Sequence, residues 1–118
     1  MKKNLSLTRE ERLRKRKEIL NAFRFSRQVS CKGIKLLFKE NKLNRNRILA
    51  ITRKGYKGAV KRNRQKRIIK EIYRNMKNNI KTGFDLIFII FPDNSINYSF
   101  KDRETQVHNL VKKAGLIF

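Results

Sequence analysis

The chain has very few residues of several kinds, and each shortage excludes a class of protein. Among its 118 residues there are one cysteine, Cys31, and one histidine, His108. A single cysteine cannot form an internal disulfide, and two soft ligands are too few for a zinc site. The longest apolar run, residues 86 to 91, ends at Pro92, far short of the ~20 residues that span a bilayer. No apolar segment follows the N-terminal lysines, so we expect a cytoplasmic protein.

Acidic residues are also scarce. The sequence has 32 Lys and Arg against 9 Asp and Glu, which gives a formal charge of +23. Repulsion on this scale opposes a compact state and attracts polyanions, so nucleic acid is the first partner to consider and an anionic membrane surface the second. With 39% hydrophobic residues the chain is too apolar for a disordered basic tail. We therefore expect one domain over residues 1–118.

The first third of the chain predicts one helix and several strands. Ile19, Leu20 and Phe23 have helical spacing and predict an amphipathic helix over residues 16–25. Thr8 and Glu11 have the spacing of a capping box, so this helix could begin at residue 9; a flexible basic arm over residues 1–14 fits equally well. Strands are predicted over residues 34–39 and 47–52, joined by a polar turn as a hairpin, and a shorter strand could cover residues 28–32.

The rest of the chain predicts a long helix, a buried strand and a last helix. Residues 59 to about 80 contain no Pro or Gly and repeat apolar side chains with the helical period. Residues 84–91 are apolar at nearly every position, as in a strand covered on both faces, so its three phenylalanines are expected in the core. Apolar spacing from Val107 to Ala114 predicts a helix with Asp102 as a candidate N-cap and Gly115 as a candidate C-cap. The fold class is therefore α+β, a small sandwich with the order α-β-β-β-α-β-α.

The strongest charge asymmetry lies between Asn41 and Lys70, where there are twelve Lys or Arg residues and no Asp or Glu. It centres on residues 61–67, in the first turns of the long helix. Cations at a helix N-terminus oppose the helix dipole by up to ~1 kcal/mol each, so a sequence selected for stability alone would place acids there. Free backbone N–H groups and flanking Arg and Lys side chains would instead bind phosphate. This interpretation is preferred to a merely solvated helix face.

The sequence offers no convincing catalytic group of its own. The close acidic pairs are Glu10 with Glu11 and Asp102 with Glu104, and neither has a histidine or carboxylate partner for metal or acid–base chemistry. His108 and Cys31 are interpreted as structural residues. We therefore predict no catalytic residue and no metal ligand in the protein.

The segment Ala59-Val-Lys-Arg-Asn-Arg-Gln-Lys-Arg67, followed by Ile68-Ile-Lys-Glu71, closely resembles the signature of the bacterial ribonuclease P protein subunit. The likeness extends from Arg12-Leu13 through the first helix, the long helix and the strand led by Asp85 to about residue 115. In that family the long helix lies in a left-handed crossover between parallel strands, against the usual right-handed rule.

The resemblance implies a function as well as a fold. Such proteins bind a large catalytic RNA, and the complex hydrolyses precursor tRNA with Mg²⁺ to release the 5′ leader. The RNA performs the reaction and holds most of the metal, while the protein binds the leader strand. The expected partners are thus the ribonuclease P RNA and precursor tRNA, with no membrane and no obligate protein partner.

Candidate binding residues follow from the charge pattern together with the resemblance. Contacts to the catalytic RNA are expected from the basic side chains of the long helix and one amide: Arg62, Asn63, Arg64, Lys66, Arg67, Lys70 and Arg74. Contacts to the leader are expected from the first helix and the sheet: Ile19, Phe23, Lys35, Phe38, Arg53 and Lys54. Phe23 and Phe38 could stack on bases or could be core residues. The family usually has an aromatic residue where this chain has Ile19, and a Gly-Asn pair where it has Lys57-Gly58.

Two other functions stay open at this point. A ribosomal or general RNA-binding protein could use the same basic helix to bind structured RNA without preference for a leader. A cationic surface-active protein would need an amphipathic segment able to leave the core, and the apolar faces here are better explained by a fold.

Overall fold

The computed structural model describes residues 7–55, 58–92 and 98–118, and these form the predicted α+β fold. The elements are α1 (Arg16–Phe25), β1 (Arg27–Cys31), β2 (Ile34–Glu40), β3 (Arg47–Thr52), α2 (Ala59–Met76), β4 (Phe84–Ile90) and α3 (Phe100–Lys113). Short 3-10 turns cover Arg9–Glu11 and Lys77–Asn79. The order predicted from the sequence is confirmed.

The pairing of the strands differs from the predicted hairpin. The sheet order is β1-β2-β4-β3, so β2 and β3 do not pair with each other. The hairpin is instead formed by β1 and β2, whose pairing closes at Cys31 with Ile34. β4 lies between β2, to which it is antiparallel, and β3, to which it is parallel. The prediction of a hairpin over residues 34–52 is therefore wrong, because the most apolar strand takes the central position, where both its edges and both its faces are covered.

The connection between β2 and β3 passes over the entry point of β4, and asparagine side chains bind the backbone there. The side-chain amide of Asn46 donates to Lys81 O at 2.9 Å, and its oxygen accepts from Phe84 N at 2.8 Å. The amide of Asn41 donates to Arg45 O at 3.1 Å, and its oxygen accepts from Leu43 N at 2.8 Å. These bonds satisfy backbone groups that the crossing leaves without ladder partners.

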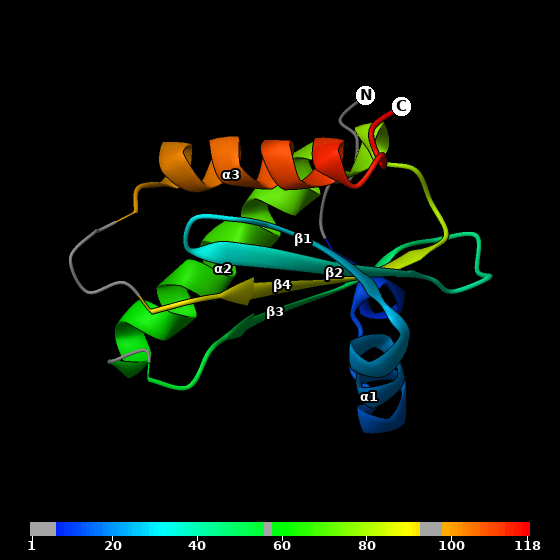
Figure 1. Ribbon diagram of the computed structural model, residues 1–118, viewed down its shortest axis with the longest axis horizontal. Coiled ribbons are helices and arrows are strands. Elements are labelled where there is room, and N and C mark those ends of the chain that lie inside the picture. The colour runs from blue at the N-terminus through cyan, green and yellow to red at the C-terminus, as the bar shows by residue number, and fades with distance from the viewer. Residues whose placement is uncertain (1–6, 56–57, 93–97) are drawn as a thin grey trace.

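α2 connects two neighbouring parallel strands. In Figure 1 the chain moves from β3 to β4, which lies beside it and points the same way, while α2 passes behind the sheet. This arrangement is a left-handed crossover, a rare exception to the right-handed rule.

The two faces of the sheet are covered unequally (Figure 1). The face under α2 and α3, here called the covered face, carries Ile34, Leu36, Phe38, Ile48, Ala50, Leu86, Phe88 and Ile90, all buried in the larger core. The face toward α1, here called the open face, carries Lys35, Leu37, Leu49, Ile51, Ile87, Ile89 and Phe91. Its core is small, with five buried residues from Leu13, Ala22 and the strands. Side-chain alternation along each strand separates these two sets.

The ends of the helices differ in detail from prediction. α3 begins after Ser99, whose hydroxyl accepts from Asp102 N at 3.2 Å while Asp102 Oδ2 accepts from Ser99 N at 3.0 Å. Ser99 is therefore the N-cap and Asp102 the third helical residue of a capping box, not the N-cap itself. The capping box at Thr8 and Glu11 precedes a 3-10 turn rather than α1.

The described part of the N-terminal segment packs on the domain. Arg12 pairs with Ile48, Leu13 N donates to Ile48 O at 2.9 Å, and the Leu13 side chain is buried. A flexible arm does not describe residues 7–14, and residues 1–6 lie outside the described part of the chain. No helix within the described ranges is both long and apolar enough to cross a membrane.

Candidate nucleic-acid interface

α2 separates its side chains into a buried side and a basic side. Gln65, Ile69, Ile72, Tyr73 and Met76 are buried against the sheet and α3. The spacing of three, four, seven and eleven residues places the predicted contacts Asn63, Lys66, Arg67, Lys70 and Arg74 on the opposite side. Arg64 is exposed beside this stripe, whereas Arg62 is half-buried and has the helical position of Ile69 and Tyr73. The structure thus brings the predicted residues of α2 other than Arg62 onto one surface, here called the basic face of α2.

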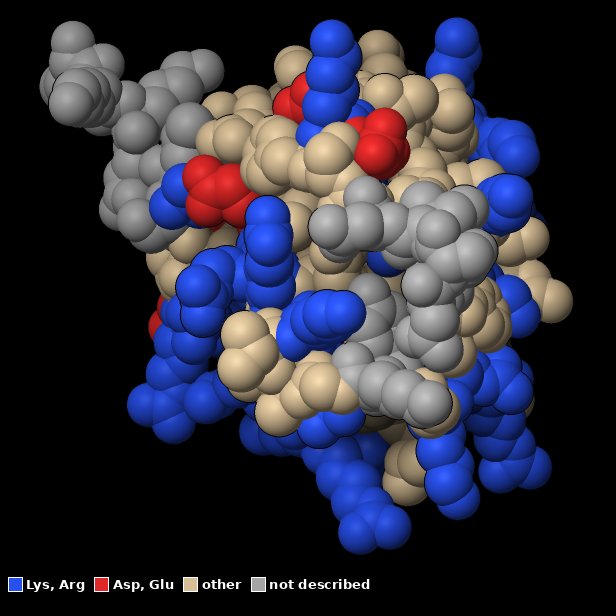
Figure 2. All heavy atoms as spheres, turned by 90° about the vertical axis from the view of Figure 1, so that its left-hand side faces the viewer, with Lys and Arg blue, Asp and Glu red and all other residues tan. Residues whose placement is uncertain are grey.

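The first turn of α2 contains no acidic side chain that could pair with the N-terminus of the helix. Its N-cap is Gly58, with a φ of 86°, no side chain caps the helix, and the first turn contains no acidic residue. Figure 2 views the end of the molecule where α2 starts and shows Lys and Arg side chains over its lower half, with few acidic ones. Backbone N–H groups without a side-chain cap, beside Lys and Arg side chains, have the chemistry that an anion requires. Tyr56 and Lys57 of the preceding glycine loop lie outside the described residues.

The N-terminal segment extends the basic face of α2. The pKa of Lys70 is lowered by partial burial, then by the nearby charges of Arg12 and Lys66. Arg12 reaches this position because it pairs with Ile48 on β3. Three cations held together in this way repel one another, and a phosphate between them would relieve the repulsion. Arg12 was quoted in the family resemblance but not among the binding residues, since its approach to α2 depends on tertiary structure.

Arg74 differs from the other predicted contacts on α2. One of its guanidinium nitrogens forms an ion pair with Glu71, one turn earlier on the helix. This partner already neutralises part of its charge. Arg67 and Lys70, by contrast, are exposed and form no salt bridge with any described residue.

A buried polar network holds the opposite side of α2. Arg103 of α3 is fully buried, and its Nε donates to Gln65 Oε1 at 2.8 Å. Its guanidinium also stacks on the Tyr98 ring, 4.0 Å from the centroid, and donates to Gln106 Oε1 at 2.9 Å. Sequence reasoning missed Arg103, although it precedes Val107 by one helical turn on the apolar side of α3. The network fixes the orientation in which α2 presents its basic face.

The open face of the sheet is only partly covered by α1. Ala22 is the one fully buried residue of this helix. At one end α1 is linked to the sheet by Arg47, which forms an ion pair with Glu18 and a bidentate one with Asp85 at 2.8 Å for both bonds. The hydrogen bond with Asp85, and after it that with Glu18, raises the pKa of Arg47, so its guanidinium stays charged. Near the other end of β4, strand pairing places Lys35, Ile89 and Ile51 in one row across the sheet.

Phe91 lies two residues beyond Ile89 on the open face, with two cations over its ring. Lys35 Nζ is 5.7 Å from the ring centroid and Arg53 Cζ is 5.5 Å from it. Lys35 and Arg53 were both predicted to bind phosphate, and the structure brings them together around an aromatic side chain. Phe91 was predicted to be core, and it is instead only half-buried. Its position two residues after Ile89, on the same side of the extended chain, is the signal that could have identified it.

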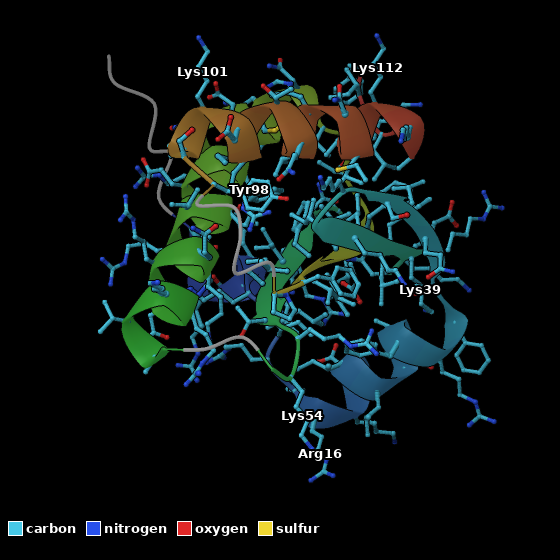
Figure 3. The ribbon with its side chains drawn as sticks, turned by 60° about the vertical axis from the view of Figure 1, so that its left-hand side comes forward. Arg16, Lys39, Lys54, Tyr98, Lys101 and Lys112 are labelled. Carbon is cyan, nitrogen blue, oxygen red and sulfur yellow. The ribbon has the colours of Figure 1, made fainter. Side chains whose placement is uncertain are left out.

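The remaining predicted leader contacts do not share one surface. Phe23 on α1 is 41% exposed and Ile19 is half-buried in the small core, so both adjoin the open face. Phe38 is 8% exposed and belongs to the larger core on the covered face. The prediction that Phe38 stacks on a base beside Phe23 is therefore wrong, because its even position in β2 turns it to the other side of the sheet. Lys54 is exposed and in Figure 3 extends from the lower end of the molecule, away from Tyr98 and α3.

Acidic side chains are mostly engaged in structural contacts. Glu11 pairs with Lys77 at 3.2 Å. The Asp102 carboxylate accepts from Ser99 N in the capping box of α3, and this hydrogen bond lowers the pKa of the carboxyl. Within the described residues no group of three or more His, Cys, Asp or Glu side chains is close enough to hold a metal ion. Burial raises the pKa of the Cys31 thiol, which disfavours the nucleophilic thiolate. What the interface offers an anion is exposed cations and backbone N–H groups without a side-chain cap.

Comparisons with known proteins point to one family. The family model described as Ribonuclease P matches residues 7–115. A protein named ribonuclease P protein component from Clostridium botulinum is 38% identical over 109 residues, which cover 92% of this chain and 97% of that protein. The solved structure of the Thermotoga maritima RNase P protein, in complex with 1-(4-fluorophenyl)-2-thiourea, superposes with a TM-score of 0.77 at 28% identity, covering 86% of this chain and 98% of that one. The Staphylococcus aureus RNase P protein has the same fold, with a TM-score of 0.81 at 20% identity over 92% of this chain and 98% of that one.

Proposed function

The chain belongs to the ribonuclease P protein family, and from this membership we propose that it is the protein subunit of a ribonucleoprotein that removes the 5′ leader of precursor tRNA. The RNA subunit performs the hydrolysis, and the protein binds both that RNA and the leader. Because these partners are nucleic acids, we place the protein in the cytoplasm. No obligate protein partner is part of the proposal.

The basic face of α2 is the proposed contact to the catalytic RNA. Arg64, Arg67 and Lys70 are exposed on it, and the helix begins without an acidic residue or a side-chain cap. Folded RNA offers phosphates in fixed positions, which suits cations held on a rigid helix. This start of α2, with no acidic residue in its first turn and no side-chain cap, is the observation that carries the proposal.

The open face beside α1 is the proposed contact to the leader. It offers Phe91 between Lys35 and Arg53, with Phe23 exposed on the adjoining helix. A row of apolar and aromatic side chains with cations at its edges suits a single strand, whose bases stack while its phosphates pair with the cations. A rigid duplex presents no free bases to such a surface.

The reaction also needs Mg²⁺, and the described residues do not offer a group of ligands that would hold it. From the family membership we assign the metal to the RNA. The role of the protein is then to neutralise RNA phosphates and to hold the leader near the cleavage site.

Reconstitution tests the proposal directly. Full-length protein, a bacterial ribonuclease P RNA and precursor tRNA are combined at low Mg²⁺, and each component is omitted in turn. Cleavage at the mature 5′ end should need both the RNA and the protein, and protein alone should not cleave at any Mg²⁺ concentration. A protein that binds the RNA without stimulating cleavage would instead be a general structured-RNA-binding protein.

A charge-matched pair of variants tests the role of α2. Arg67→Ala should weaken binding to the catalytic RNA and reduce the slope of log K against log salt by ~0.7 to 0.9. Lys101→Ala, at an exposed lysine on α3 away from both proposed contacts, removes the same charge and should leave the slope nearly unchanged. Equal effects of the two variants would mean that Arg67 contributes only its net charge to RNA binding and makes no specific phosphate contact.

A further inference from the structure

A third surface, separate from the basic face of α2 and from the open face, lies where α3 ends. It is a groove of about 380 Å³ between the end of α1, the outer ends of β1 and β2, the loop before β4 and the turn after α3. Its lining residues are Phe25, Arg27, Phe38, Lys39, Glu40, Lys81, Phe84, Ala114, Gly115 and Leu116. In Figure 3, Lys39 lies on the opposite side of the molecule from α2. We call this site the α3-end groove.

The floor of the α3-end groove is apolar, and one wall is an exposed aromatic ring. Phe38 and Leu116 are almost fully buried beneath it, and Phe84 is half-buried. Phe25, the last residue of α1, is 61% exposed and packs in neither core. An isolated exposed phenylalanine needs no explanation, but one that lines a groove with an apolar floor provides a surface on which a flat ring can stack.

The rim of the α3-end groove is cationic. Arg27, Lys39 and Lys81 face one acidic residue, Glu40, and none of the three cations forms a salt bridge with a described residue. The pairing of Arg27 with Phe38 places the Arg27 side chain on the same face of the sheet as the apolar floor. An occupant should therefore have a flat apolar part and a negative charge close to it.

We propose that the α3-end groove binds an unpaired RNA nucleotide, with its base against Phe25 and Phe84 and its phosphates at Arg27 and Lys81. A nucleotide combines a stackable ring with an adjacent anion, which matches both the floor and the rim. An acidic peptide would satisfy the rim, but only its occasional aromatic side chain would use the ring surface. The site would give the protein a second contact to single-stranded RNA, independent of leader binding at the open face.

The test is an NMR titration of full-length ¹⁵N-labelled protein with a dinucleotide, 5′-phosphorylated uridylyl-uridine, and separately with an acidic decapeptide. The dinucleotide should shift the amide signals of residues 25–27, 39–40, 81–84 and 114–116 in one saturable process. Signals around Phe91 should follow their own saturation curve, so failure of leader binding and failure of this proposal are distinguishable. Shifts at the groove with the peptide but not with the dinucleotide, or with neither, would overturn the proposal.

Three variants connect the response to the groove. Phe25→Ala should raise the Kd of the groove process about fivefold or more, the low end of what stacking one base is worth. Lys81→Glu should weaken it as well, whereas Lys101→Glu makes the same charge change on α3, away from the groove, and should not. Phe25 and Lys81 are both exposed, so thermal melts should show folded proteins. Equal weakening by Lys81→Glu and Lys101→Glu would mean that only net charge acts, and the nucleotide site would be rejected.

Discussion

The two faces of the one sheet are built from alternate residues of the same strands, yet they are buried to very different extents. On the covered face, Leu36, Phe88 and Ile90 are fully buried under α2 and α3. On the open face, Lys35 and Phe91 remain accessible because α1 buries little more than Ala22. Stability is therefore concentrated on one side of the sheet, which leaves the other side free to keep aromatic and basic residues exposed. Four predictions test this division.

The largest effect is expected from the covered face. Phe88→Ala removes a fully buried ring from the larger core, and it should reduce the free energy of unfolding by ~3 to 5 kcal/mol. Urea unfolding measures this loss. Phe91→Ala, the same substitution three residues later on the open face, is the matched control and should cost clearly less. Similar losses for the two variants would contradict the division.

Alkaline titration tests the covered face in a second way. Burial raises the pKa of Tyr73 to about 12, from 10.0 in water. The neutral ring stabilises the folded protein fully below about pH 10, and this contribution is lost as the pH rises towards 12, because only the unfolded chain ionises in that window. The loss should be ~1 to 3 kcal/mol. Tyr73→Phe should remove this part of the pH dependence. Urea unfolding of the two proteins at pH 9.5, 10.5 and 11.5 measures it. If the free energy of unfolding changes equally with pH in both proteins, the pKa of Tyr73 is not raised by burial.

The open face should respond in binding rather than in stability. Phe91→Ala should weaken binding of precursor tRNA by ~1 to 3 kcal/mol, the value of one stacked base, without changing the affinity for mature tRNA. Phe23→Ala should act in the same direction, with a small effect on unfolding because its ring is 41% exposed. Filter binding with the two RNAs measures the difference. Equal loss for leader-bearing and mature tRNA would remove these rings from the leader site.

The smallest effect is expected from a single cation of the open face. Lys35→Gln should reduce the salt slope for leader-bearing substrate by ~0.7, the value for one phosphate contact to a single strand. Lys112→Gln, at an exposed lysine on α3, should not change the slope. If both substitutions leave the salt slope unchanged, Lys35 contacts the Phe91 ring but no leader phosphate.

The sequence predicted the elements well because each has a strong local signal. α1 was placed at its observed bounds, and the apolar period of α2 and the unbroken apolar run of β4 are features of neighbouring residues. The pairing of the strands, by contrast, depends on residues that are far apart in the sequence. Nothing in residues 34–52 alone shows that β4, more than thirty residues later, will come between β2 and β3.

The candidate site was predictable in the same uneven way. The basic face of α2 follows from helical spacing, and strand alternation could have turned Phe38 away from the open face and Phe91 towards it. Two contacts could not be predicted, because each depends on two elements meeting in space. They are the approach of Arg12 to Lys70 and the hydrogen bond from Arg103 to Gln65. The binding roles assigned to these residues stay predictions until RNA binding is measured.

The central position of β4 also determines when the protein can fold during its synthesis. β2 and β3 are complete once residue 52 has been made, but their common neighbour comprises residues 84–90 of 118. Until then the nascent chain has one hairpin, and the inner edges of β2 and β3 lack a partner, as does the apolar side of α2. A ribosome must therefore translate as far as Ile90 before the sheet can close. The exposed cations of the incomplete chain, which repel one another, then help to keep it from aggregating during that interval.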